Sequence, residues 1–460
     1  MNSQEISILT ENQKRFFRAG NTLAVASRLA ALKRLRDCIK SREREICEAL
    51  SSDLGKSAYE SFMCEIGLVL SEIGWMIRNA PKLAKPRKVA SPITQFHSRC
   101  FTVKEPYGTV LIMSPWNYPF LLTFGPLSNA IAAGNTAVVK PSAYSPRTSE
   151  IVKQIIGECF DPGHVACVTG GRMENASLLK ERFDLIFFTG SQNAGREVLR
   201  CAAENLTPAI LELGGKSPCI IDSSADIELA AKRIAFGKFL NCGQTCVAPD
   251  HILCERKIKE RFAEALKRQI EKQFGKEPLK NGNYGKIISK VHFDRLSKLI
   301  DPAKTIVGGE CDEESCRIAP TVMDNVTDDD AVMKEEIFGP ILPILVFDDF
   351  DSLVNDLKKK EKPLALYVFS SSKERTDRIV KEVSYGGGCI NDVVIHLATS
   401  EMGFGGVGAS GMGAYHGETG FNAFSHTKSI IDKKTWIDLS MRYQPYGSKI
   451  YEKLLHWLLK

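Results

Sequence analysis

None of the 14 cysteines forms a CxxC pair, and none joins a histidine at zinc-ligand spacing. No metal site is therefore expected, and cysteines in so long a chain indicate thiols of a reducing compartment. The N-terminus leads into Lys14, Arg15 and Arg18 without an apolar core, so we expect no signal peptide and a cytoplasmic protein. The densest basic cluster, Lys358–Lys362, is short and is typical of a solvated helix end, which argues against nucleic acid as a partner.

Charge is absent from residues 107–139, a run long enough to suggest a membrane span. Pro115 and Pro119 interrupt the run, and Gly125-Pro126 interrupts it again. A buried strand, a loop and a buried helix fit this pattern better, because a core element can be apolar on both faces. The apolar stretch at 454–459 is too short to span a bilayer and predicts a contact helix or a docked tail. No membrane span is expected.

The composition is that of a soluble globular protein. The chain has 460 residues, of which 43% are hydrophobic and 25% charged, and the basic and acidic residues behind its net charge of +6 are interleaved. This length allows two or three domains with a large core. Apolar residues at steps of three and four predict one helix over about 22–50 and a second over about 58–79, ended by Pro81.

From Gly108 onward short apolar strands alternate with helices, which predicts a mostly parallel sheet covered by helices on both faces. The alternation restarts after Gly214-Gly215, a sensible boundary between two α/β blocks. Residues 82–103 interrupt the pattern and predict an extended excursion, such as a hairpin. The expected strands are 109–113, 136–139, 165–168, 185–188, 209–211, 218–221, 251–254 and 366–369, with others near 306 and 344–347.

The stretch Asn241–Pro249 contains Cys246 between a Gly-Gln turn and a short apolar step. A thiol close to backbone amides can serve as a nucleophile whose negative charge the amides stabilise. The alternative is a small buried thiol that packs beside a turn, which is the commoner role of an intracellular cysteine.

Two polar residues at strand ends are candidates for the same chemistry. Glu212 lies between two leucines, where burial raises the pKa of a carboxyl group toward the range of a general base. Asn117 lies between two prolines, so its amide is a candidate donor to an oxyanion. The alternatives are a carboxylate satisfied by backbone amides and an ordinary turn-forming asparagine.

Further motifs suggest a nucleotide. The turn Thr189–Gly195 joins a strand to a helix and would let a phosphate approach the helix N-terminus, although the GxGxxG fingerprint is absent and a plain tight turn is the alternative. Lys140 follows a strand, where a lysine can bind a ribose or a phosphate, or can be simply solvated. Glu336 could hold a sugar hydroxyl pair and Phe338 could pack on a flat ring, or the two could mark only a helix end.

Taken together, these motifs resemble those of the aldehyde dehydrogenases over about residues 20–435. The matching motifs are Pro115–Pro119, Lys140–Ser142, Phe188–Ser191 with Gly195, Leu211–Lys216, Gly243–Cys246 and Glu336–Pro340. Ala248–Asp250 and Ser410–Gly417 resemble the class 3 branch, which contains the fatty and aromatic aldehyde dehydrogenases.

The resemblance implies an α/β fold with three parts. A Rossmann-type NAD(P)-binding domain would comprise residues 1–81 and 104–212, and an α/β catalytic domain residues 213–415. A small β oligomerisation element would comprise 82–103 and 416–435, followed by a tail at 436–460. The enzyme would be a homodimer that acts on medium- or long-chain aliphatic or aromatic aldehydes, and Val393–Met402 would line the substrate entrance.

The resemblance also implies a role for each site residue. Cys246 would be the nucleophile, Asn117 and the Cys246 N–H would hold the oxyanion, and Glu212 would activate water. The cofactor, NAD or NADP, would contact Lys140 and Glu336 through its riboses and Phe338 near its nicotinamide. Gly190, Ser191 and Gly195 would lie by its pyrophosphate and adenine.

Two residues depart from the family pattern. Ala143 follows Lys-Pro-Ser where the family often has a glutamate, so we expect NADP to be accepted alongside NAD. Cys242, four residues before Cys246, is either a small packed side chain or the partner in a reversible disulfide that protects the nucleophile. Two alternatives to a hydrolytic dehydrogenase stay open: an enzyme that transfers the acyl group to coenzyme A, and a catalytically silent homologue.

Overall fold

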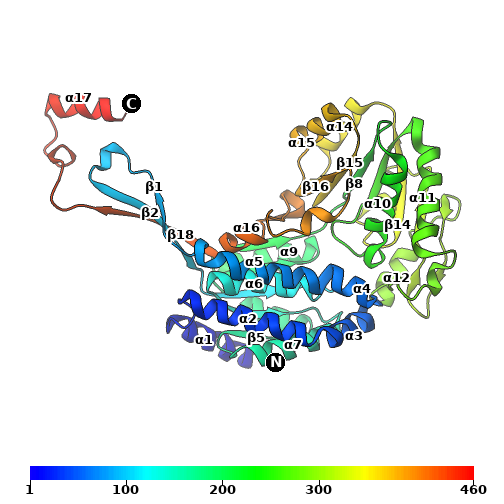
Figure 1. Ribbon diagram of the computed structural model, residues 1–460, viewed down its shortest axis with the longest axis horizontal. Coiled ribbons are helices and arrows are strands. Elements are labelled where there is room, and N and C mark those ends of the chain that lie inside the picture. The colour runs from blue at the N-terminus through cyan, green and yellow to red at the C-terminus, as the bar shows by residue number, and fades with distance from the viewer. Residues whose placement is uncertain (460) are drawn as a thin grey trace.

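The structure, a computed structural model, describes residues 1–459. Two lobes, each built on a sheet covered by helices, lie side by side, and a narrow three-stranded arm extends from one of them (Figure 1). The first lobe contains the chain up to about Glu212, and the second contains most of the chain after it. The expected α/β architecture is therefore present.

The first sheet has the order β17-β7-β6-β3-β4-β5. Its central strand β3 (Thr109–Met113) is buried at every residue, as a parallel strand covered on both faces should be. The other parallel strands are β4 (Thr136–Lys140), β5 (Val165–Cys167), β6 (Leu185–Thr189) and β7 (Ala209–Glu212). The edge strand β17 (Gly411–Met412) runs antiparallel to β7, although sequence analysis assigned it to the second block. The helices of this layer are α6 (Leu121–Ala133), α7 (Pro146–Cys159), α8 (Arg172–Lys180) and α9 (Gln192–Glu204).

The N-terminal helices differ from the expected pair. Helix α1 (Ser3–Arg18) precedes them, and the single helix expected over 22–50 is wrong. The chain turns at Arg42, whose φ of −107° and ψ of 16° are not helical. The two resulting helices are α2 (Val25–Ser41) and α3 (Glu43–Leu54).

The end expected at Pro81 is also wrong. Helix α4 (Ala58–Ser61) passes through a π-helical turn at Phe62–Ile66 into α5 (Gly67–Leu83), which contains Pro81 in its last turn. A proline so close to a helix end removes a single backbone donor and leaves little helix beyond it to disrupt.

The second sheet has the order β10-β13-β14-β9-β8-β15-β16 and is parallel except for β10. Its strands are β8 (Pro218–Ile221), β9 (His251–Glu255), β10 (Thr305–Val307), β13 (Thr321–Met323), β14 (Ile341–Phe347), β15 (Ala365–Phe369) and β16 (Gly387–Ile390), and β11 (Cys311–Asp312) pairs separately with β12 (Arg317–Ile318). The helices are α10 (Ile227–Phe239), α11 (Lys259–Phe274), α12 (Lys290–Ser297), α13 (Ala331–Lys334), α14 (Phe350–Lys359) and α15 (Lys373–Glu382). The expected restart of the alternation is therefore confirmed.

The arm consists of β1 (Arg87–Val89), β2 (Ser98–Pro106) and β18 (Ser425–Lys433), all antiparallel. The expected hairpin is confirmed by β1 and β2. Strand β18 returns from the far end of the chain, after α16 (Gly417–Ala423), and pairs with β2 along nine residues from Ser425 to Lys433. Six of its residues are exposed, and its outer edge has no strand partner within residues 1–459.

Beyond the arm lies the C-terminal helix α17 (Lys449–Leu458), near the tip of the β1–β2 hairpin (Figure 1). All its apolar side chains are exposed to some degree, including Ile450 and Trp457 at 76% and 69%. Within residues 1–459, no helix has both the length and the apolar character that crossing a bilayer requires.

Candidate active site

A cavity of about 770 Å³ opens between the two lobes. Loops that follow β3, β6 and β7 line it from the first sheet, which is the usual ligand-binding edge of a parallel sheet. Of the predicted site residues, those that line the cavity are Asn117, Gly190, Ser191, Glu212, Cys246, Glu336 and Phe338. The fold therefore brings together residues that are far apart in the sequence, and the cavity has the size typical of a cofactor site.

The Asn117 side chain is fixed by the loop that carries Cys246. Its amide nitrogen donates to the Gln244 backbone carbonyl at 3.0 Å, and the Asn117 backbone carbonyl accepts from the Asn241 side-chain amide at 2.8 Å. Next to it, the Tyr118 and Thr245 hydroxyls are 2.7 Å apart. Because an amide NH₂ has two hydrogens, one of them anchors the side chain and the other is available to an oxyanion in the cavity.

A buried ion pair that sequence analysis missed fixes the same loop from behind. Lys56 and Glu65 are fully buried, with Nζ and Oε1 2.5 Å apart. The ammonium of Lys56 also donates to the Asn117 carbonyl at 3.1 Å, and the other oxygen of Glu65 accepts from the N–H groups of Phe120 and Leu121. Only the fold reveals this arrangement, because Glu65 lies in the unanticipated π-helical turn.

The turn before Cys246 has an unusual backbone. Asn241 and Cys242 have φ values of 51° and 53°, in the left-handed region that costs a non-glycine residue of order 1–3 kcal/mol. The N–H of Asn241 donates to Glu60 at 2.9 Å, which helps to hold this conformation. Gly243 follows with a φ of 71°, and a Cβ atom there would lie 2.2 Å from the Gly339 carbonyl oxygen. The Cys246 turn is thus packed directly on the segment that follows Phe338.

Cys246 is half-buried beside two carboxyl groups. Burial, with Glu336 and Glu212 nearby, raises the pKa of its thiol to about 12, and the N–H groups of Cys246 and Val247 partly oppose this. The thiol is therefore protonated at neutral pH, and it needs a neighbouring proton acceptor or a cation in the cavity to become a thiolate.

Glu212 ends β7 and is 2% exposed. Neither of its carboxylate oxygens has a hydrogen-bond partner among residues 1–459, and burial raises its pKa well above the usual value. A buried carboxyl group without partners is costly for the fold, but it is what a general base near a water site requires.

Glu336 packs on the double glycine that follows Glu212. A Cβ atom on Gly214 would lie 2.2 Å from the Glu336 Oε2 atom, so only glycine leaves room for this carboxylate. Burial and the nearby Asp250 raise the pKa of Glu336 to about 8. Phe338 lies edge-on to Trp116, with ring centroids 5.4 Å apart, and the two rings give the cavity an aromatic wall.

The turn after β6 begins α9, and Thr189–Asn193 line the cavity there. The Ser191 hydroxyl accepts from the Ala194 N–H at 3.4 Å and so caps the helix. The buried Thr189 hydroxyl has no hydrogen-bond partner in the part of the chain that the structure describes. A helix N-terminus beside an unpaired buried hydroxyl can form a binding site for a phosphate.

Lys140 and Gly195 are placed differently from the other predicted cofactor residues. Neither lines the cavity. Lys140 is 3% exposed and donates to the carbonyls of Pro141 and Gly170 at 2.8 and 2.7 Å. A Cβ atom on Gly195 would lie 2.8 Å from a methyl carbon of Leu213, so this glycine allows close packing of α9 on the first sheet. Both residues therefore have structural contacts, and their contacts with the cofactor stay predictions.

Cys242 is 2% exposed, and its surroundings differ from those of Cys246. Its sulfur lies beside Tyr284 and Gly285, and Glu60 helps to raise its pKa, whereas Glu336 and Glu212 help to raise the pKa of Cys246. Both thiols are free. The contacts favour packing as the role of Cys242, and the protective disulfide stays a prediction that peroxide treatment of a Cys242→Ser variant would test.

The comparisons with known proteins agree with this geometry. The profile of the aldehyde dehydrogenase family matches residues 1–430. The chain belongs to that family. It is 44% identical to the 4,4'-diaponeurosporen-aldehyde dehydrogenase of Staphylococcus aureus over 440 residues, which cover 95% of this chain and 96% of the relative. It is also 40% identical to the dog "aldehyde dehydrogenase, dimeric NADP-preferring", with 97% and 99% coverage.

Other relatives are aldehyde dehydrogenase family 3 members, so this aldehyde dehydrogenase is class 3-like. A solved structure, the substrate-bound state of Staphylococcus aureus AldH, superposes with a TM-score of 0.97 at 43% identity and covers 99% of both chains. The fold and the enzyme class, an oxidoreductase acting on aldehydes, follow from these matches.

Proposed function

We propose that this aldehyde dehydrogenase oxidises apolar aldehydes to carboxylic acids with NAD or NADP, through a thioester on Cys246 that water hydrolyses. The observation that carries the proposal is the convergence of Cys246, Asn117 and Glu212 on one cavity that also contains a helix N-terminus. A bound nicotinamide dinucleotide would supply the hydride acceptor. Gly190, Ser191, Glu336 and Phe338 line the cavity where it would be held.

The residues divide the chemistry between them. The Cys246 thiolate attacks the aldehyde carbon, and the free amide hydrogen of Asn117 and the Cys246 N–H stabilise the oxyanion of the thiohemiacetal. Loss of hydride from this carbon leaves a thioester. Glu212 removes a proton from water, the hydroxide adds to the thioester, and the carboxylic acid leaves as Cys246 departs as thiolate.

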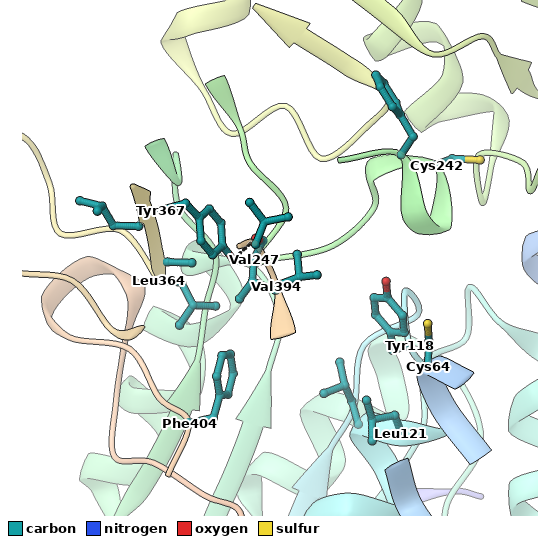
Figure 2. Close-up of a cluster of buried hydrophobic side chains, with 14 of the residues drawn as sticks. Cys64, Tyr118, Leu121, Cys242, Val247, Leu364, Tyr367, Val394 and Phe404 are labelled. Atoms are coloured by element: carbon teal, nitrogen blue, oxygen red, sulfur yellow. Dashed lines mark hydrogen bonds between the residues drawn. The ribbon is translucent and has the colours of Figure 1, made fainter. Parts of the chain in front are cut away.

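A cluster of buried apolar side chains that do not themselves line the cavity includes Val247, the residue after Cys246. Figure 2 shows Tyr118, Leu121 and Cys64 in one group. Val247, Val394, Tyr367 and Phe404 lie apart from this group, on the opposite side of the picture. All seven are buried, and Val247 directly follows the nucleophile. Val394 belongs to the predicted substrate entrance, Val393–Met402, and Phe404 lies two residues beyond it. An aldehyde whose chain extends from Cys246 toward Val247 would meet these apolar and aromatic side chains, which suits medium- or long-chain and aromatic aldehydes.

An assay of acyl release tests the proposal against coenzyme A acylation. We expect aliphatic aldehydes of increasing chain length to give NADH and an equal amount of carboxylic acid without coenzyme A, because Glu212 supplies the base for hydrolysis. Coenzyme A should leave the rate within about twofold. A dependence of NADH formation on coenzyme A, with an acyl thioester as the product, would contradict the proposal.

We expect the enzyme to accept both NAD and NADP. Ala143 is exposed just after β4 and carries no carboxylate that would repel a 2′-phosphate. We therefore expect kcat/KM for NADP within about tenfold of that for NAD, since a single charge contact contributes about 1.4 kcal/mol at this exposure. Ala143→Glu should lower the NADP value selectively, and the uncharged Ala143→Gln is the control. An NAD preference well above tenfold in the unmodified enzyme would rule out dual use.

The arm suggests a homodimer. Strand β18 has an exposed outer edge with Ile430 and Ile431 on it, and β16, the last strand of the second sheet, also has a free edge within residues 1–459. Unpaired strand edges favour strand addition by a second chain. We therefore propose that residues 82–103 and 416–435, which include β1, β18 and most of β2, form the oligomerisation element.

A further inference from the structure

The segment that carries Glu336 is held from both sides by one ion pair. Lys216 Nζ lies 2.5 Å from Asp250 Oδ2 and also donates to the carbonyls of Glu335 at 2.9 Å and Val332 at 3.1 Å. The other oxygen of Asp250 accepts from the Ile337 N–H at 2.9 Å. The peptide groups that precede and follow Glu336 are therefore both bonded to this pair.

The position of Lys216 in the sequence adds to this arrangement. It directly follows Gly214-Gly215, on which the Glu336 carboxylate rests, and the Gly215 N–H faces that carboxylate. One short turn therefore receives the Glu336 side chain and also provides the ammonium that holds its backbone. Arg295 adds a third bond, from its guanidinium to the Ile337 carbonyl at 2.6 Å.

Burial strengthens the hydrogen bonds of the Lys216–Asp250 ion pair. The Lys216 side chain is 23% exposed and that of Asp250 4%, so water competes weakly for their bonds. Although burial opposes ionisation, His251, Lys216 and Lys238 hold the pKa of Asp250 below its usual range. Asp250 thus stays ionised at neutral pH.

We infer that the Lys216–Asp250 ion pair is a positioning device for the cofactor: it holds the Glu335–Ile337 backbone so that the Glu336 carboxylate faces the cavity. Neither residue needs to touch the reacting atoms. The inference rests on the proposed function in one respect, namely that Glu336 holds part of a dinucleotide.

Lys216→Met and Asp250→Asn test this inference. Lys216→Met removes all three donor contacts, whereas Asp250→Asn can still accept from the Ile337 N–H but loses the charge. Since a displacement of about 1 Å can cost up to about 100-fold, we expect Kd and KM for the dinucleotide to rise about tenfold or more. Lys216→Arg, which keeps the charge and several donors, should recover part of the loss.

Ester hydrolysis separates positioning from general damage. Hydrolysis of p-nitrophenyl acetate without cofactor needs only the nucleophile, the oxyanion donors and the base, so its rate should stay within about twofold in the variants. Lys259→Met is the matched control, since Lys259 and Asp324 form a comparably buried pair, 2.8 Å apart and outside the cavity lining. It should leave cofactor binding unchanged.

Three outcomes would overturn the inference. The first is an unchanged dinucleotide Kd in both variants, measured by quenching of protein fluorescence. The second is an equal fall in ester hydrolysis and cofactor binding, which would show that the pair supports the fold in general. The third is the same loss of binding in Lys259→Met. If the unmodified protein binds the dinucleotide without oxidising any aldehyde, the proposed function fails. The comparison of dinucleotide Kd between the unmodified protein and the variants still tests the positioning role of the Lys216–Asp250 pair.

Discussion

Cys246→Ala lowers kcat for aldehyde oxidation by about 10⁴-fold or more, because removing the nucleophile of a covalent mechanism removes the whole acylation route. The same variant loses ester hydrolysis without cofactor, since both reactions pass through an acyl group on the same sulfur. Dinucleotide binding should remain, because Cys246 forms only one part of a large cavity wall. Steady-state kinetics and a binding titration on one preparation measure the three quantities.

Cys242→Ala is the matched control, since this thiol lies in the same turn but faces Tyr284 rather than the cavity. It should retain activity, with a lower melting temperature from the lost packing. Without cofactor, alkylation of Cys246 by iodoacetamide should accelerate about tenfold per pH unit up to about pH 10, because its pKa of about 12 keeps the thiolate scarce. A plateau near neutral pH would contradict the protonated thiol, and activity in Cys246→Ala would contradict the assignment of the nucleophile.

The parallel sheets could be predicted from the sequence, whereas the N-terminal helices could not be predicted in detail. Strands such as β3 are buried on both faces, so their continuous apolar runs are visible without a fold. The turn at Arg42 and the π-helical turn at Phe62–Ile66 have no such signal. The latter places the Glu65 carboxylate against Lys56 and the N–H groups of Phe120 and Leu121, which are tertiary contacts that outweigh local propensity.

Only part of the cavity could be predicted from the sequence. Asn117 follows one parallel strand and Glu212 ends another. The carboxyl ends of parallel strands meet at one edge of the sheet, so their proximity follows from the alternation. The ion pairs Lys56–Glu65 and Lys216–Asp250 could not be anticipated, because either carboxylate could have been a solvated surface group. For Lys140 the contact with the cofactor stays a prediction, and what the sequence could not reveal is that the Gly170 carbonyl from a neighbouring loop accepts from its ammonium.

Glu212→Gln separates the two halves of the reaction. The thioester still forms, but without a base its hydrolysis slows by about 10²- to 10⁴-fold. We therefore expect a rapid burst of NADH that matches the number of active sites, followed by a slow steady rate. In the unmodified enzyme the steady rate should rise with pH through the raised pKa of Glu212, because only the ionised carboxylate accepts a proton. This rise should disappear in Glu212→Gln, and a variant without a burst would place Glu212 in acylation instead.

The same substitution has an expected effect on stability. Burial raises the pKa of Glu212 above its unfolded value, so the folded state binds the proton more tightly and loses stability as pH rises through the folded pKa. Glu212→Gln removes this loss and should melt at a higher temperature than the unmodified protein at about pH 8, but not at about pH 4, below the unfolded pKa. Glu255→Gln should show the opposite sign, because Ser223 and Arg375 hydrogen-bond that buried carboxylate and keep its pKa below the usual value despite burial. A lower melting temperature for Glu212→Gln at about pH 8 would show that other groups of the protein stabilise the ionised Glu212 carboxylate. This result would contradict the unpartnered carboxylate that the proposed general base requires.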